Sequence, residues 1–111
     1  MSIKTLTLSN VSDVFTTLPR EDQKEIFNIG TAFRLLDLQK RLAHAQESMR
    51  RFEAKYGTTL DMLESEGLPE DANYEMHEDY IEWHYWARVR EKTQNTLDIL
   101  ASVSKVHEME R

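Results

Sequence analysis

The chain has 111 residues, enough for one domain, and its 31% of charged residues, net charge of −6, three glycines and two prolines favour helix over sheet. The negative charge argues against nonspecific binding of the whole chain to nucleic acid. Cysteine is absent, which excludes disulfides and thiol chemistry, and without a long apolar run or an apolar leader we expect a cytoplasmic protein with no membrane span.

Residues 1–18 are predicted to form an N-terminal arm. The β-branched side chains within Ile3–Leu8 are typical of a short strand. Ser9 or Asn10 could then cap a helical turn. Pro19 ends this arm, because the residue before a proline avoids the α region, and proline itself suits the first position of a helix.

A helical domain is predicted over residues 19–109, and it begins with a long helix that ends near Tyr56. Apolar residues recur there at alternating spacings of three and four, which is the pattern of a coiled-coil seam. An upstream set continues this spacing in a shifted register, so we expect a stutter near Gly30. Gly57 predicts the end of the helix. The seam consists of Leu35, Leu38, Leu42, Ala45, Met49, Phe52 and Tyr56.

The rest of the chain predicts a short helix over Leu60–Glu66 and a second long helix over about Tyr74–Met109. Two long helices of similar length and a medium connection indicate an all-α fold, a long antiparallel hairpin with a short helix in the connection. Each helix keeps a side that its partner cannot cover, and the side chain of Trp83 exceeds what one facing helix can bury, so we expect two hairpins to form a homodimeric four-helix bundle. The predicted core residues are Leu35, Leu38, Leu42, Met49, Phe52, Tyr80 and Trp83.

The strongest functional signal is an acidic window between Tyr56 and Ala87. It contains nine carboxylates, no lysine or arginine, and six of the ten aromatic residues. An acidic surface with large aromatic side chains suits a basic protein partner. In the alternative interpretation the aromatic residues belong to the dimer core and the acids are solvated charges favoured by the start of a helix. The predicted partner-binding residues are Glu70, Asp71, Tyr74, Glu78, Asp79, Glu82 and Trp86.

A metal site is an alternative use of the same carboxylates. Glu75, Glu78, Asp79 and Glu82 fall on one helical face, and Mg²⁺ prefers carboxylate oxygens. The arrangement resembles the E-x-x-E element of dimeric, Mg²⁺-dependent all-α nucleotide pyrophosphohydrolases. Those enzymes pair this element with a second acidic element on another helix. The facing part of the first helix mixes its acids with arginine and lysine, so it is a poor candidate for that second metal-binding element. We therefore expect no metal, no cofactor and no enzyme activity.

The histidines and a band of cations are two further candidates for binding sites. No histidine follows a glutamate by three positions, as di-iron bundles require. Pairs such as Asp37–Arg41 and Glu47–Arg51 predict a mixed, solvated face, although its cations could also hold a phosphate backbone. We expect no nucleic-acid partner. The band of cations comprises Lys40, Arg41, Arg50, Arg51, Lys55, Arg88, Arg90 and Lys92.

Four segments carry a resemblance to known proteins: Leu18-Pro19, Phe33-Arg34-Leu35-Leu36-Asp37-Leu38, Phe52-Glu53-Ala54-Lys55-Tyr56-Gly57-Thr58 and Tyr80-Ile81-Glu82-Trp83. Through these segments the chain resembles small helical proteins of prokaryotes that act as antitoxin components of two-gene toxin–antitoxin modules. The resemblance implies a helical antitoxin-like protein that neutralises a basic partner encoded nearby. A structural coiled-coil adaptor is a third interpretation.

Overall fold

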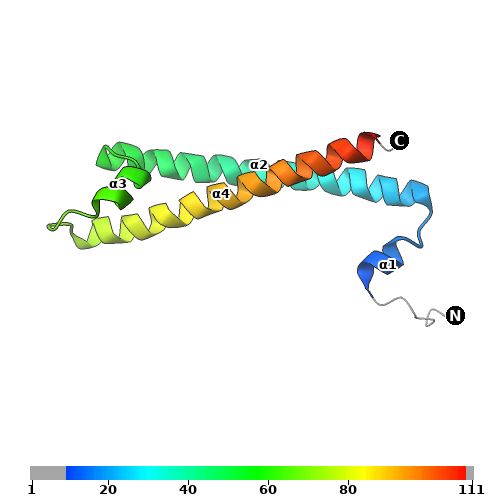
Figure 1. The fold of residues 1–111 in the computed structure, drawn as a ribbon, viewed down its shortest axis with the longest axis horizontal. Coiled ribbons are helices and arrows are strands. Elements are labelled where there is room, and N and C mark those ends of the chain that lie inside the picture. The colour runs from blue at the N-terminus through cyan, green and yellow to red at the C-terminus, as the bar shows by residue number, and fades with distance from the viewer. Residues whose placement is uncertain (1–9, 110–111) are drawn as a thin grey trace. The chain divides into compact units, whose positions relative to one another are not determined.

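The computed structural model describes residues 10–109, and this part of the chain contains four helices and no strand (Figure 1). The predicted all-α class is therefore confirmed over the described residues, whereas the strand predicted at Ile3–Leu8 lies outside them. The chain divides into two compact units, one that ends at Arg34 and one that begins at Leu35. Helix α2 runs through both units, so the boundary falls inside a helix.

The first unit contains α1, Val11–Phe15, and the start of α2. The side chain of Asn10 caps α1, because its Oδ1 accepts a hydrogen bond from the Asp13 backbone N–H at 2.9 Å. The side chain of Gln23 donates to the carbonyl oxygen of Leu18 at 2.9 Å and so holds the turn before α2. The predicted helical turn before Pro19 is confirmed.

Helix α2 spans Arg20–Tyr56 and ends as the sequence predicts. Gly57 has a φ of 65°, a left-handed conformation that favours glycine, and its N–H donates to the Glu53 carbonyl at 2.8 Å. The chain then turns into α3, Leu60–Glu66, where the Thr59 hydroxyl caps the first turn by accepting from the Met62 N–H at 3.2 Å.

Helix α4 spans Tyr74–Met109, and the Asn73 side chain caps it by accepting from the Met76 N–H at 2.9 Å. From Leu35 onward α2 runs antiparallel to α4, and α3 lies between the two helices at the closed end of this hairpin (Figure 1). The predicted helical hairpin with a short helix in its connection is confirmed.

The core of the second unit is built at the closed end of the hairpin from three helices of a single chain. It consists of Met49 on α2, Leu60 and Leu63 on α3, and Trp83 on α4. The Trp83 indole is completely buried and stacks on the Phe52 ring, with centroids 5.6 Å apart. Since α3 supplies the missing cover, the expectation that Trp83 needs a second chain for its burial is wrong.

The remaining predicted core residues follow the same inward line. Leu38 is buried, and Leu35, Leu42, Phe52 and Tyr80 are half-buried. Apart from Leu38, the buried positions further along the hairpin carry small side chains, which allow helix backbones to approach closely. These small buried residues are Ala45 and Ser48 on α2 and Thr93 on α4.

Candidate interaction surface

One side of α4 presents large apolar side chains to solvent. Tyr74, Ile81 and Tyr85 are 78%, 64% and 51% exposed, respectively. Their spacings of seven and four place them on one side of the helix, opposite the buried Trp83. Tyr74 was among the predicted partner-binding residues, but Ile81 and Tyr85 were not. The regular spacing was visible in the sequence, and only their exposure separates them from core residues.

The predicted partner-binding acids differ in their surroundings. Glu70 and Asp71 lie in the connection between α3 and α4 and are exposed, as are Glu78 and Glu82 on α4. Asp79 differs, because it is half-buried and bound by side chains at the end of α2. It helps to hold the hairpin together, whereas the other four carboxylates face solvent.

The Asp79 carboxylate belongs to a polar cluster that joins the two long helices. The Lys55 ammonium donates to Asp79 Oδ2 at 2.7 Å and to Glu75 Oε2 at 2.5 Å. The Tyr56 hydroxyl donates to the same Asp79 oxygen at 2.5 Å. The cluster therefore ties the last turn of α2 to the first turns of α4.

This cluster shifts the pKa values of its members in the directions that its hydrogen bonds require. The Lys55 ammonium, followed by the Tyr56 hydroxyl, holds the pKa of Asp79 below its ordinary value. Burial, followed by the hydrogen bond to Asp79, raises the pKa of Tyr56. The bonds to Asp79 and then to Glu75 raise the pKa of Lys55. The three groups therefore favour an ionised Asp79 beside a protonated lysine and tyrosine.

Tyr80, predicted for the core, and Trp86, predicted for binding, both have contacts inside the chain. Tyr80 packs against the core and meets the His84 ring edge-on, with centroids 5.5 Å apart. Trp86 is half-buried and packs on the His44 ring of α2, with centroids 4.6 Å apart. Its Nε1–H donates to Glu82 at 3.4 Å. Trp86 therefore contributes to the packing between α2 and α4.

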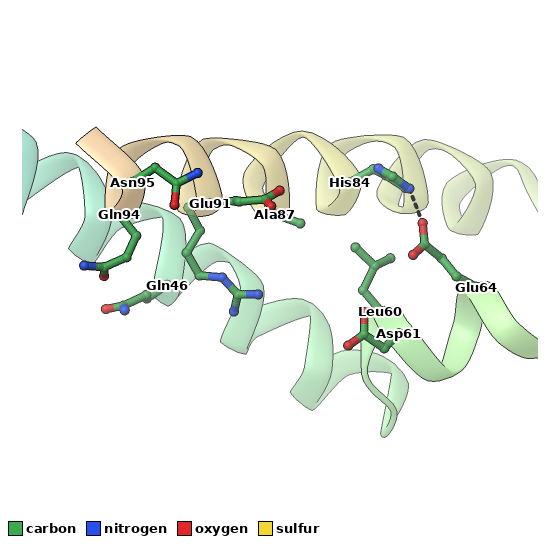
Figure 2. Close-up of a pocket in the computed structure, with 10 residues that line it drawn as sticks. Gln46, Leu60, Asp61, Glu64, His84, Ala87, Glu91, Gln94 and Asn95 are labelled. Atoms are coloured by element: carbon green, nitrogen blue, oxygen red, sulfur yellow. Dashed lines mark hydrogen bonds and ion pairs between the residues drawn. The ribbon is translucent and has the colours of Figure 1, made fainter. Parts of the chain in front are cut away.

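An open groove of about 580 Å³ lies between α2, α3 and α4 (Figure 2). Glu64 on α3 contacts Nε2 of His84 on α4 across this groove, and Figure 2 shows the two side chains pointing toward each other. A carboxylate only accepts hydrogen bonds, so we assign the hydrogen to Nε2. The other ring nitrogen, Nδ1, is buried and has no hydrogen-bond partner within the described residues. This contact fastens α3 onto α4.

The carboxylates considered for a metal site do not converge. Within residues 10–109, no group of three or more His, Asp or Glu side chains is placed to hold a metal ion. Glu75 and Asp79 instead share the Lys55 ammonium, which already supplies the positive charge at that point.

The band of cations is a mixed surface. Glu47 forms its ion pair with Arg50 at 3.0 Å, and Arg51 donates to the Ser48 hydroxyl at 3.2 Å, in place of the expected Glu47–Arg51 pair. Lys55 is held by the carboxylates of α4. Arg50 and Lys55 of this band are therefore already paired with acids of the same chain.

Comparison with models of protein families, with characterised proteins and with solved structures finds no match to this chain. No helix within residues 10–109 combines the length and the apolar character that a membrane span requires.

Proposed function

We propose that this chain is a non-enzymatic protein–protein interaction protein that acts as a homodimer and binds a basic protein, in the manner of an antitoxin. The binding surface would be the acidic tip, which we define as those exposed acids of α3 and of its connection to α4 that have no cationic partner, together with two exposed apolar residues. The acidic tip consists of Asp61, Glu66, Glu70 and Asp71 with Met62 and Tyr74.

The observation that carries this proposal is the lack of internal partners for most acids of the window. Of its nine carboxylates, Glu75 and Asp79 are paired with Lys55 and Glu64 with His84. The other six have no cationic partner within the described residues. Like charges this close repel one another, and a basic partner would relieve that repulsion while its encounter with the tip is steered by the field.

The exposed apolar residues give the tip a means of holding a partner after encounter. Tyr74 is almost fully solvated, and Met62 is also exposed. Tyrosine is enriched among residues that dominate binding energy, and methionine adapts to irregular surfaces. The expected partner is a small basic protein encoded by the neighbouring gene.

The proposal is tested by neutralising the tip without changing the fold. In the triple variant Glu66→Gln, Glu70→Gln, Asp71→Asn, we expect association with the neighbouring gene product to slow and to lose part of its salt dependence, because exposed interface charges act mainly on the association rate. Stopped-flow or surface-based kinetics at two salt concentrations would measure both effects.

The matched control carries the same loss of three negative charges outside the acidic window. It is the variant Glu21→Gln, Asp22→Asn, Glu25→Gln at the start of α2, where all three side chains are exposed. We expect its association rate to stay within about twofold of the parent protein, since physiological salt screens interactions between exposed charges that lie more than roughly 8 Å apart. Equal rates for the tip variant and the parent, or equal slowing by both triple variants, would contradict the proposal.

A further inference from the structure

The exposed side of α4 continues past Tyr85 as a regular seam of its own. Starting at Tyr74, the residues on this side follow one another at spacings of four, three, four, three and four. All of them are exposed, in contrast to the buried Trp83 on the opposite side of the helix. We call this line the outer seam, and it consists of Tyr74, Glu78, Ile81, Tyr85, Arg88 and Lys92.

The outer seam changes character along its length in an ordered way. Its first part carries the acid Glu78, its centre carries the apolar pair Ile81 and Tyr85, and its second part carries the cations Arg88 and Lys92. A seam that is acidic at one end and basic at the other is complementary to a reversed copy of itself. From this order we propose that a second copy of this chain covers the outer seam, with the two α4 helices antiparallel about a two-fold axis near Trp83.

The centre of this arrangement is apolar. In antiparallel coiled coils, positions of one seam face the reversed positions of the other, so Ile81 would face Tyr85 of the second copy, and Tyr85 would face Ile81. A two-fold axis makes this contact twice. It would remove from water two side chains that are more than half exposed in one chain, which favours association.

The charged positions complete the match on both sides of this centre. Glu78 would face Arg88 of the second copy, and the symmetric contact would pair Arg88 with Glu78. One step further out, Tyr74 would face Lys92 of the second copy, an arrangement that suits a cation against an aromatic ring. Each of the six seam residues therefore meets a partner of complementary chemistry.

One neighbour of the seam opposes this arrangement. Glu82, which lies beside the outer seam, would come near Glu82 of the second copy close to the axis. Its carboxylate is within reach of Trp86 Nε1 at 3.4 Å, which draws it away from the seam. The two favourable ion pairs outnumber this single repulsion.

The order of charges also explains why the occupant is a second copy and not the basic partner of the tip. A uniformly basic surface would match Glu78 but would meet Arg88 and Lys92 with the same sign of charge. The outer seam excludes Glu66, Glu70 and Asp71, so these acids of the tip stay available in the dimer, and only Tyr74 is shared between the two surfaces. This inference rests on the proposed homodimer and specifies its interface.

The test exchanges the charges of one pair. Arg88→Glu places glutamate opposite Glu78 twice in the dimer, and Glu78→Arg places arginine opposite Arg88 twice. We expect the dimer dissociation constant, measured by sedimentation velocity over a range of concentrations, to rise at least tenfold in each single variant. An equimolar mixture of the two should form a heterodimer, because all its pairs are then of opposite charge, and the double variant should dimerise like the parent.

Arg90→Glu is the matched control, since it makes the same change of charge two residues along α4 but on the groove side, away from the outer seam. We expect its dimer dissociation constant to stay within about twofold of the parent. Circular dichroism of each variant checks that the helical content is kept. If the parent dimerises but Arg88→Glu and Glu78→Arg dimerise equally well, this interface is wrong and the homodimer stands. If the parent stays monomeric at hundreds of micromolar, both the interface and the homodimer are wrong, and binding at the acidic tip is judged separately by its own kinetics.

Discussion

At the scale of single residues, the cluster of Lys55, Tyr56 and Asp79 contains a carboxylate that was predicted to bind a partner. Asp79 instead stabilises the fold, because it binds side chains at the end of α2. Asp79 receives two hydrogen bonds from the end of α2, and its side chain is only 18% exposed. The cluster closes the hairpin at the point where α2 and α4 are joined by their connection. Its members therefore contribute to stability in a way that depends on pH.

The sign of this dependence follows from the pKa directions. The pKa of Asp79 is lowered in the folded chain from 3.8, so its contribution to stability is present above that value and is lost as the pH falls through the folded pKa. The pKa of Tyr56 is raised from 10.0, so its contribution is present below pH 10 and is lost as the pH rises through the folded pKa.

We expect Asp79→Asn to lower the free energy of unfolding at pH 7 by about 1–2 kcal/mol, since it removes the charge from two hydrogen bonds. The variant should also lose part of the parent's acid sensitivity below about pH 4. Tyr56→Phe should keep that acid sensitivity and lose part of the alkaline one. Urea unfolding at pH 3, 7 and 10.5 measures all three, and Asp71→Asn on the exposed connection serves as the control with no expected change. A parent and an Asp79→Asn variant with the same acid profile would contradict this prediction.

At the scale of elements, α3 decides how the hairpin is packed. Its leucines, Leu60 and Leu63, fill the space between the closed ends of α2 and α4 and complete the burial of Trp83. The Trp83 Nε1–H is buried, and no hydrogen-bond acceptor meets it within the described residues. The indole is therefore held by its size and stacking, while its polar atom opposes burial.

Two substitutions at Trp83 separate the stabilisation by ring packing from the cost of the buried N–H. Trp83→Ala removes the ring and leaves a cavity, and we expect it to lower the free energy of unfolding by about 3–5 kcal/mol. Trp83→Phe keeps an aromatic ring against Phe52 and removes the unsatisfied N–H, whose burial costs about 1–3 kcal/mol, so we expect a much smaller loss. Chemical unfolding at pH 7 measures both, and an equal loss in the two variants would show that the indole nitrogen is satisfied in solution.

At the scale of the whole molecule, the acidic tip and the outer seam offer two surfaces of different chemistry. The tip has a single sign of charge and suits a basic protein, whereas the outer seam changes sign and suits its own reversed copy. They involve different charged residues, since the tip uses the acids of α3 and the connection. Only Tyr74 belongs to both.

The charged residues of the two surfaces should therefore act independently. We expect Arg88→Glu to weaken the dimer while each chain still associates with the basic partner at the parent rate. The triple variant of Glu66, Glu70 and Asp71 should slow partner association while the dimer dissociation constant stays unchanged. Sedimentation and binding kinetics on the same preparations give both quantities. If either variant weakens both dimerisation and partner association, one shared surface serves both contacts.

The helices and their ends follow from local signals in the sequence. Pro19, Gly57 and Asn10, one of two cap candidates, mark boundaries that the structure reproduces, because capping and backbone conformation depend on residues within one turn. The seam from Leu35 to Tyr56 likewise predicted the side of α2 that packs against α4, since helical periodicity assigns residues to a face. The homodimer and its four-helix bundle stay predictions.

Which aromatic and acidic side chains face solvent depends on how the helices pack in three dimensions. The window from Tyr56 to Ala87 predicted an acidic surface but could not distinguish Asp79, which binds Lys55, from Glu78 beside it. Likewise, Trp83 and Tyr85 are two residues apart, and one is buried while the other is exposed. These differences depend on where α3 and the end of α2 lie against α4, and contacts between segments distant in sequence leave no local pattern to read.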